Sequence, residues 1–140
     1  MATFKDYLEN NSLLILHGAL GTEMEALGYD ISGKLWSAKY LLEKSEVIQE
    51  LHETYVAAGA DLITTSSYQA TLPGLVEAGL TEKAAEQIIA LTVRLAKAAR
   101  DKVWGALDET EKAKRPYPLI SGDVGPYAAY LANGSEYSGD

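Results

Sequence analysis

Three segments of the chain hold groups that could contact a small polar ligand: residues 17–21, 64–69 and 122–127. The glycines of the first segment let a ligand approach the main chain, and free N–H groups there can bind a carboxylate. A tight turn with positive φ would need the same residues. Hydroxyls and a phenol in the second segment can orient a polar amino acid, or can cap the next turn while Tyr68 packs. The residue types alone leave both interpretations open.

The third segment leads into a pair of tyrosines. Tyr127 and Tyr130 are separated by one helical turn in the sequence, so a short helix would place both rings on one face. Such a face attracts a cation, including a sulfonium or an ammonium group, and ordinary aromatic packing is the alternative. Trp36 precedes a predicted helix and is interpreted, on its own, as a packing residue.

Several common catalytic and cofactor sites are excluded by the pattern. The first segment lacks the glycine spacing of a dinucleotide fingerprint and the lysine of a phosphate-binding loop. The chain has two histidines, His17 and His52, and no cysteine, which together form no recognisable zinc pattern. No Ser-His-Asp or Cys-His set can be assigned by spacing. His52 is predicted to lie on the exposed face of a helix.

Each of the three polar segments follows a short apolar run that predicts a buried strand, over residues 13–16, 61–65 and 118–121. The alternation of strands with long helical stretches predicts a parallel α/β arrangement with right-handed crossovers. Ligand sites in such folds lie at the carboxyl ends of the strands. The three polar segments are therefore expected to be neighbours, in a β/α barrel or in an open doubly wound sheet.

Two helices are predicted between the strands. The first runs over residues 45–58, with Ser45 as its N-cap and Gly59 after its last turn. The second runs over residues 81–103, with Thr81 as its N-cap. Their apolar residues recur at helical spacing. We expect the buried faces to be Val47, Ile48, Leu51, Tyr55 and Val56 in the first helix, and Ala85, Ile88, Ile89, Thr92, Leu95, Ala96, Ala99 and Val103 in the second.

Composition narrows the class of protein. The chain has 140 residues, a formal net charge of −8 and no cysteine, which excludes a disulfide framework and a thiolate metal site. The acidic balance disfavours nucleic acid and anionic membranes as partners. No apolar run approaches the roughly 20 residues that cross a bilayer, and the first residues have no apolar signal core. We therefore expect a cytoplasmic protein.

Four stretches, taken together, resemble the N-terminal part of the homocysteine S-methyltransferases: GALGTEMEALGYD (18–30), LWSAKYLLE (35–43), ETYVAAGADLITTSSYQAT (53–71) and GDVGPYAAYLANGSEYSGD (122–140). The resemblance implies a zinc-dependent TIM (β/α)8 barrel. It also implies transfer of a methyl group from S-methylmethionine or S-adenosylmethionine to homocysteine, giving methionine. Zinc would activate the thiol as a thiolate, and the donor is a sulfonium that already carries a good leaving group.

The resemblance also implies substrate-binding residues. Those carried over by position are Gly18, Ala19, Trp36, Ser67, Tyr68, Gly125, Pro126, Tyr127 and Glu136. His17 belongs to the same set but departs from the family, which usually has an aspartate there, expected to contact the amino group of homocysteine. A histidine cannot supply that carboxylate. The departure leaves two alternatives, loss of homocysteine binding or a different acceptor for the amino group.

The family's zinc ligands are three cysteines that lie beyond the region matched here. A (β/α)8 barrel needs about 250 residues, and we identify three strands of its eight. We interpret residues 1–140 as a partial, apparently truncated homocysteine-binding β/α-barrel domain. We expect no zinc bound to it, no methyl transfer by it alone, and self-association through its open sheet edge. The alternatives are a non-catalytic α/β remnant and the homocysteine-binding module of a methionine synthase.

Overall fold

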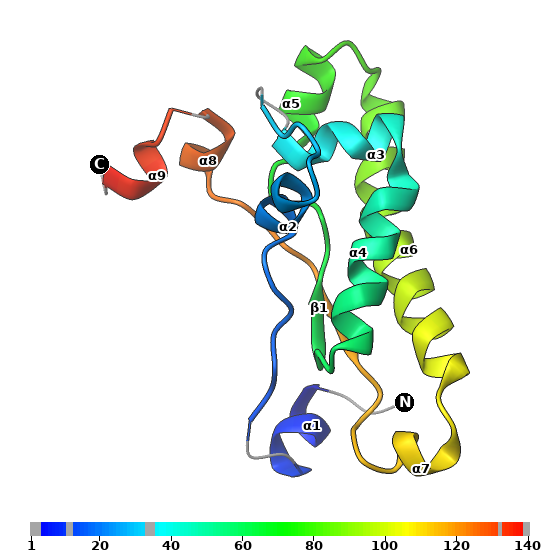
Figure 1. Cartoon of the computed structure of the whole chain (residues 1–140). Coiled ribbons are helices and arrows are strands. Elements are labelled where there is room, and N and C mark those ends of the chain that lie inside the picture. The colour runs from blue at the N-terminus through cyan, green and yellow to red at the C-terminus, as the bar shows by residue number, and fades with distance from the viewer. Residues whose placement is uncertain (1–3, 11–12, 33–35, 132, 139–140) are drawn as a thin grey trace.

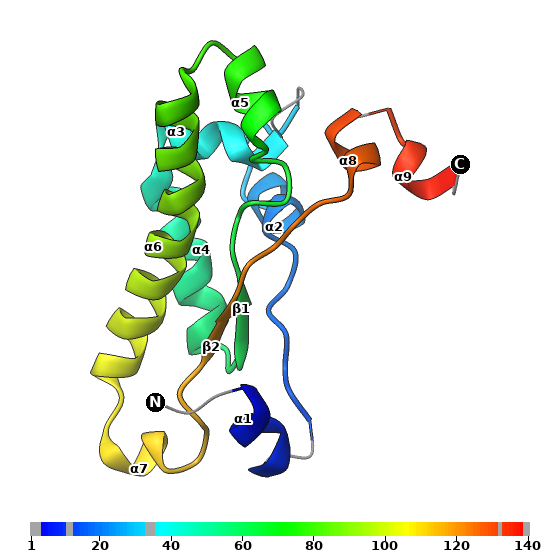
Figure 2. The same ribbon diagram turned by 180° about the vertical axis from the view of Figure 1, so that it is seen from behind.

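A small parallel sheet forms the centre of the computed structural model, which describes residues 4–10, 13–32, 36–131 and 133–138. Strand β1 (Leu62–Thr64) pairs in parallel with β2 (Leu119–Ser121). On its other edge β1 pairs with the extended segment before it through a single parallel bridge at Leu16. The order in space is therefore the extended segment, β1 and β2, with β1 in the middle (Figures 1 and 2).

Helices make up most of the remaining described chain. Their bounds are α1 (Phe4–Asn10), α2 (Leu20–Ala26), the 3₁₀-helix η1 (Trp36–Lys39), α3 (Tyr40–Glu43), α4 (Ser45–Ala57), α5 (Leu72–Glu77), α6 (Glu82–Ala106), α7 (Glu109–Lys112), α8 (Tyr127–Leu131) and α9 (Ser135–Ser138). Helices α4 and α6 run side by side along one face of the sheet, while α8 and α9 project away from it (Figure 1). None of the described helices is both long and apolar enough to span a membrane.

Helix α4 confirms the predicted buried face. Val47, Ile48, Leu51 and Val56 are buried, and Tyr55 is half-buried. The helix ends in a Schellman motif, in which the N–H of Ala60 donates to the carbonyl of Tyr55 at 3.0 Å. Gly59 supplies the required left-handed residue, with φ at +106°. The start was predicted one residue late, since Ser45 is the first helical residue and Lys44 is the cap.

Helix α6 also follows the predicted pattern. The Thr81 hydroxyl accepts a hydrogen bond from the N–H of Ala84 at 3.3 Å, which confirms the N-cap. Within the expected stripe, Ala85, Thr92, Leu95, Ala96 and Ala99 are buried and Ile88, Ile89 and Val103 are half-buried. The helix continues three residues beyond the predicted end, to Ala106.

Helices α4 and α6 and the sheet share one apolar core. Val56, Ala60, Ile63 and Ala96 are buried together, with Ile120 packed against them. A second and larger apolar cluster includes Met24, Leu41, Ile48 and Leu75. It packs helices α2, α3, α4 and α5 against α6. The layers of helix on sheet hold the carboxyl ends of the strands in fixed positions.

Two predictions about burial are wrong. Residues 13–16 were expected to form a buried strand, but only Leu16 makes a bridge, and the side chains of Leu13, Ile15 and Leu16 are each more than half exposed. The segment is the outer edge of the sheet, and no other described strand pairs with its far side. His52 was expected at the surface, yet it is fully buried, because α4 turns that face toward the extended segment and the sheet.

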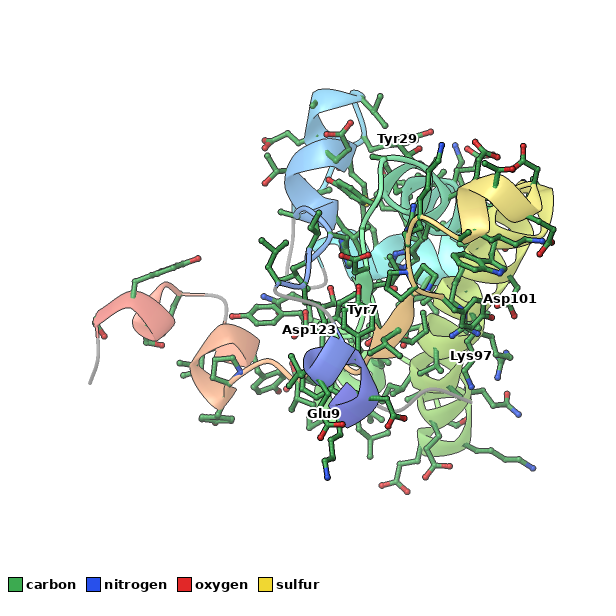
Figure 3. All side chains as sticks on the ribbon, turned by 90° about the horizontal axis from the view of Figure 1, so that it is seen from below. Tyr7, Glu9, Tyr29, Lys97, Asp101 and Asp123 are labelled. Atoms are coloured by element: carbon green, nitrogen blue, oxygen red, sulfur yellow. The ribbon has the colours of Figure 1, made fainter. Side chains whose placement is uncertain are left out.

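Polar side chains stabilise the amino ends of the strands. Buried Asp61 accepts a hydrogen bond from the N–H of Ile15 at 3.0 Å. Tyr7 of α1, labelled in Figure 3, interacts with the side chain of Asp61. Desolvation, followed by the contact with Asp61, raises the pKa of Tyr7 above its ordinary range. Arg115 donates to the carbonyls of Val56 at 2.8 Å and Ala60 at 2.7 Å, so its guanidinium caps the end of α4.

Candidate functional site

The carboxyl ends of the three sheet segments open into one cleft of about 500 Å³. The loops that follow Leu16, β1 and β2 are called here the first loop (residues 17–19), the second loop (65–71) and the third loop (122–126). All three contribute to the cleft, together with the first turn of α2. The lining residues are Leu16, His17, Gly18, Ala19, Leu20, Gly21, Thr22, Thr64, Thr65, Ser66, Tyr68, Gln69 and Asp123.

His17 forms part of the cleft wall, and both of its ring nitrogens are engaged within the chain. Nδ1 lies 2.5 Å from the carbonyl oxygen of Gly18. Nε2 lies 2.5 Å from the Thr64 hydroxyl and 3.0 Å from the Thr64 carbonyl oxygen. The side chain is buried. No nitrogen lone pair of His17 is therefore left to accept a hydrogen bond from a ligand.

A second buried histidine supports the first. The rings of His17 and His52 meet edge to face with centroids 5.6 Å apart. Among the described residues, neither ring nitrogen of His52 has a hydrogen-bond partner. Desolvation, with a smaller contribution from His17, lowers the pKa of His52 to about 4. His52 is therefore neutral at neutral pH and acts as packing beneath the cleft.

Tyr55 fixes the first loop from the side of α4. Its hydroxyl donates to the carbonyl of Ala19 at 3.2 Å, and its ring lies 5.2 Å from that of His17. A Cβ atom at Gly18 would stand 2.7 Å from the Tyr55 ring. Only glycine fits at this position without displacing the ring. Packing against Tyr55 therefore explains the glycine at position 18 without reference to a ligand.

The second and third loops are tied together by hydroxyl groups. The N–H of Asp123 donates to Thr65 Oγ1 at 2.9 Å, and the Ser67 hydroxyl donates to the Asp123 carbonyl at 2.5 Å. Thr65 and Ser67 are also hydrogen-bonded to each other at 2.7 Å. Both main-chain groups of Asp123 are thus held by the loop after β1.

The third loop then passes directly over Tyr68. A Cβ atom added to Gly125 would collide with the main-chain carbonyl of Tyr68, so glycine permits the close approach. Pro126 and Tyr127 are exposed and do not line the cleft. The chain continues into α8, which carries it away from the sheet (Figure 2).

The tyrosine pair of α8 lies beside the cleft rather than in it. The rings of Tyr127 and Tyr130 are 5.7 Å apart, which confirms that the two share a face. Tyr130 donates to Glu77 on α5 at 2.5 Å, and this hydrogen bond raises the pKa of Tyr130. Tyr127 is 74% exposed, so its ring is free to contact a ligand or another segment.

The family model described as "Homocysteine S-methyltransferase" matches residues 14–140. The chain belongs to the homocysteine S-methyltransferase family. Homocysteine S-methyltransferase YbgG of Bacillus subtilis is 44% identical over 140 residues, which is all of this chain and 44% of that protein. The homocysteine S-methyltransferase of Escherichia coli is 44% identical over 133 residues, or 95% of this chain and 41% of that protein.

A solved structure shares the fold. The metallated form of the homocysteine methyltransferase MmuM from Escherichia coli superposes with a TM-score of 0.80 at 44% identity, covering 96% of this chain and 45% of that one. The match makes the fold that of part of a homocysteine methyltransferase. The chain spans less than half the length of the relatives that it matches.

Only some of the predicted site residues line the cleft. His17, Gly18, Ala19 and Tyr68 line the cleft, whereas Ser67 does not line it and donates a hydrogen bond to the third loop. Gly125 contacts Tyr68 without lining the cleft. Trp36 falls in η1 and Glu136 in α9, and both side chains are outside the part that the structure describes.

Several lining residues were not singled out individually from the sequence. They are Thr64, Thr65, Ser66, Gln69 and Asp123. All five belong to the polar segments that directly follow the predicted strands. The sequence signal for these residues was their position at the ends of predicted strands. That signal identifies a loop but does not single out a side chain within it.

The described residues do not fit a zinc ion. They contain no group of three or more His, Asp or Glu side chains that could hold a metal, and the chain has no cysteine. Both nitrogens of His17 are already engaged. A metal of the kind held by the metallated relative would need ligands from elsewhere.

Proposed function

We propose that this chain forms the homocysteine-facing part of a homocysteine S-methyltransferase. The observation that supports the proposal is the meeting of three loops, from three neighbouring sheet segments, in one cleft. The substrate-binding set is His17, Gly18, Ala19, Trp36, Ser67, Tyr68, Gly125, Pro126, Tyr127 and Glu136. His17 serves as a wall of the site, since its nitrogens are engaged by Gly18 and Thr64.

The proposed reaction moves a methyl group from S-methylmethionine or S-adenosylmethionine to homocysteine. The thiol sulfur forms a bond to the methyl carbon as the carbon–sulfur bond of the sulfonium breaks. The donor leaves as a neutral thioether, and the thiol proton is released. In-line alignment of the two sulfur atoms is the main demand on the protein. The exposed ring of Tyr127, paired with Tyr130, provides an electron-rich face for the sulfonium.

Zinc enters this proposal only as a property that the resemblance implies for the family. The described residues do not fit the metal. We therefore assign no zinc-dependent step of the reaction to these residues. We further propose that the sheet is the first three β/α units of a TIM barrel, and that residues 1–140 are one partial domain.

We also propose that the protein is located in the cytoplasm, and fractionation of cells tests this location.

Self-association follows from the exposed edge of the sheet. Leu13, Ile15 and Leu16 are all more than half exposed along the outer segment, and unpaired edges favour pairing with another chain. We propose that two copies pair through this edge. Light scattering at tens of micromolar protein is expected to give a mass above that of one chain, and a monomer under these conditions contradicts the pairing.

A chimera tests the function. Residues 1–140 would replace the matching 44% of Bacillus subtilis YbgG, and methionine formation would be measured from homocysteine with each donor separately. The proposal predicts homocysteine-dependent methionine formation with at least one sulfonium donor. A chimera that is folded by circular dichroism, yet forms no methionine with either donor, contradicts the proposal.

A further inference from the structure

Asp123 is the one carboxylate among the residues that line the described cleft, and no lysine or arginine lines it. Among the described residues, the Asp123 side chain takes part in no hydrogen bond or ion pair. Figure 3 shows the residue at the start of the segment that leads from the sheet to α8. Among the described residues that line the cleft, the acidic side chain of Asp123 therefore has no cationic partner.

The main chain at Asp123 is held in place although its side chain is free. Its N–H is bound by Thr65 and its carbonyl by Ser67, and two residues later Gly125 is pressed against the Tyr68 carbonyl. The residue is half-buried. A half-buried carboxylate on a fixed main chain can bind a cation at a small entropic cost, because the loop does not have to be reordered.

The remaining polar groups of the cleft do not compete for this role. His17 has both nitrogens engaged, and the other lining side chains with polar atoms are neutral hydroxyls and one amide. An ammonium group entering the cleft would form a charge-assisted hydrogen bond with Asp123.

We propose that Asp123 binds the α-ammonium group of the amino acid substrate. The inference rests on the proposed function for the identity of that substrate, homocysteine. It assigns the specificity for an amino acid, as opposed to a thiol of similar length, to one side chain of the third loop. The sulfonium of the donor is the other cation that the cleft could receive, and the experiment separates the two.

The test compares dissociation constants of three ligands for the 140-residue chain, from titrations followed by amide chemical shifts. L-Homocysteine carries the ammonium, 4-mercaptobutanoate is the same molecule without it, and dimethylsulfoniopropionate carries a sulfonium without an ammonium. The wild-type chain is expected to bind homocysteine at least 10-fold more tightly than 4-mercaptobutanoate. Asp123→Asn is expected to weaken homocysteine binding 10- to 100-fold and to leave the two other ligands within 2-fold.

Two further variants keep the result interpretable. Asp123→Ser removes the charge with a smaller side chain and should match Asp123→Asn, while Glu86→Gln on the exposed face of α6 should match the wild type. Unchanged homocysteine binding in Asp123→Asn overturns the proposal while the proposed function stands. A loss confined to dimethylsulfoniopropionate also overturns it, in favour of the sulfonium. Failure of the wild type to bind homocysteine overturns both this proposal and the proposed function.

Discussion

The hydroxyl of Thr65 accepts a hydrogen bond from the main-chain N–H of Asp123 at 2.9 Å, across a separation of 58 positions. With the bond from Ser67 to the Asp123 carbonyl, it joins the loops that follow β1 and β2. The shape of the cleft therefore depends on a few hydroxyl groups rather than on apolar packing alone.

Thr65→Val should remove this connection with little change in volume. The N–H of Asp123 would lose its acceptor in a half-buried position, and we expect the free energy of unfolding to fall by about 1–2 kcal/mol. Urea denaturation measures the change. Thr54→Val on the exposed face of α4 is the matched control, and an equal effect of the two substitutions would show that the bond to Asp123 contributes nothing specific.

Gly125→Ala should disturb the third loop, because the added Cβ would collide with the main-chain carbonyl of Tyr68. The main chain cannot yield as a flexible side chain would, so we expect a loss of about 1–3 kcal/mol in the free energy of unfolding. Gly122→Ala in the same loop meets no atom within 4 Å and should be nearly neutral. Thermal or urea unfolding of the pair decides the point, and equal stabilities would contradict the contact.

His52 should make stability depend on pH. Its folded pKa is about 4, against 6.5 for the free group, so between these values the unfolded chain binds a proton that the folded chain does not. The stabilisation is complete above pH 6.5 and is lost as the pH falls toward 4, by up to about 3 kcal/mol. His52→Leu removes this contribution and leaves every other titrating group in place. Stability curves for the two proteins that run parallel from pH 7 to pH 4 would contradict the buried, neutral histidine.

Arg115→Met should weaken the end of α4. The guanidinium binds the carbonyls of Val56 and Ala60, and their loss should cost about 1.5–3 kcal/mol in the free energy of unfolding. Lys114→Met, at the exposed neighbouring position, is the control and should change stability by less than about 0.5 kcal/mol. Retained stability in Arg115→Met would mean that the helix end is held by its Schellman motif alone.

The sequence predicts those features that depend on neighbours along the chain. The hydroxyl of Thr81 and the spacing of Ala85, Thr92 and Ala99 were enough to predict α6 and its buried face. The expectation that loops after successive parallel strands would be neighbours also holds, because His17, Thr65 and Asp123 line one cleft.

The features that sequence reasoning missed depend on contacts between distant segments. The burial of His52 depends on which elements cover α4, and a lone histidine on a helix gives no sign of that. The bond from Tyr130 to Glu77, which joins residues 53 positions apart, has no local signal either. Asp123 was part of a predicted loop, but its selection required knowing that Asp123 lines the cleft and that the His17 nitrogens are occupied.

The most direct test of the central claim is a map of the backbone amides that change when L-homocysteine is added to the ¹⁵N-labelled chain. The three-loop site predicts saturable shifts in residues 17–21, 64–69 and 122–125, with α7 and the second half of α6 unaffected. Shifts that do not saturate, or that cluster away from these three loops, would contradict the account.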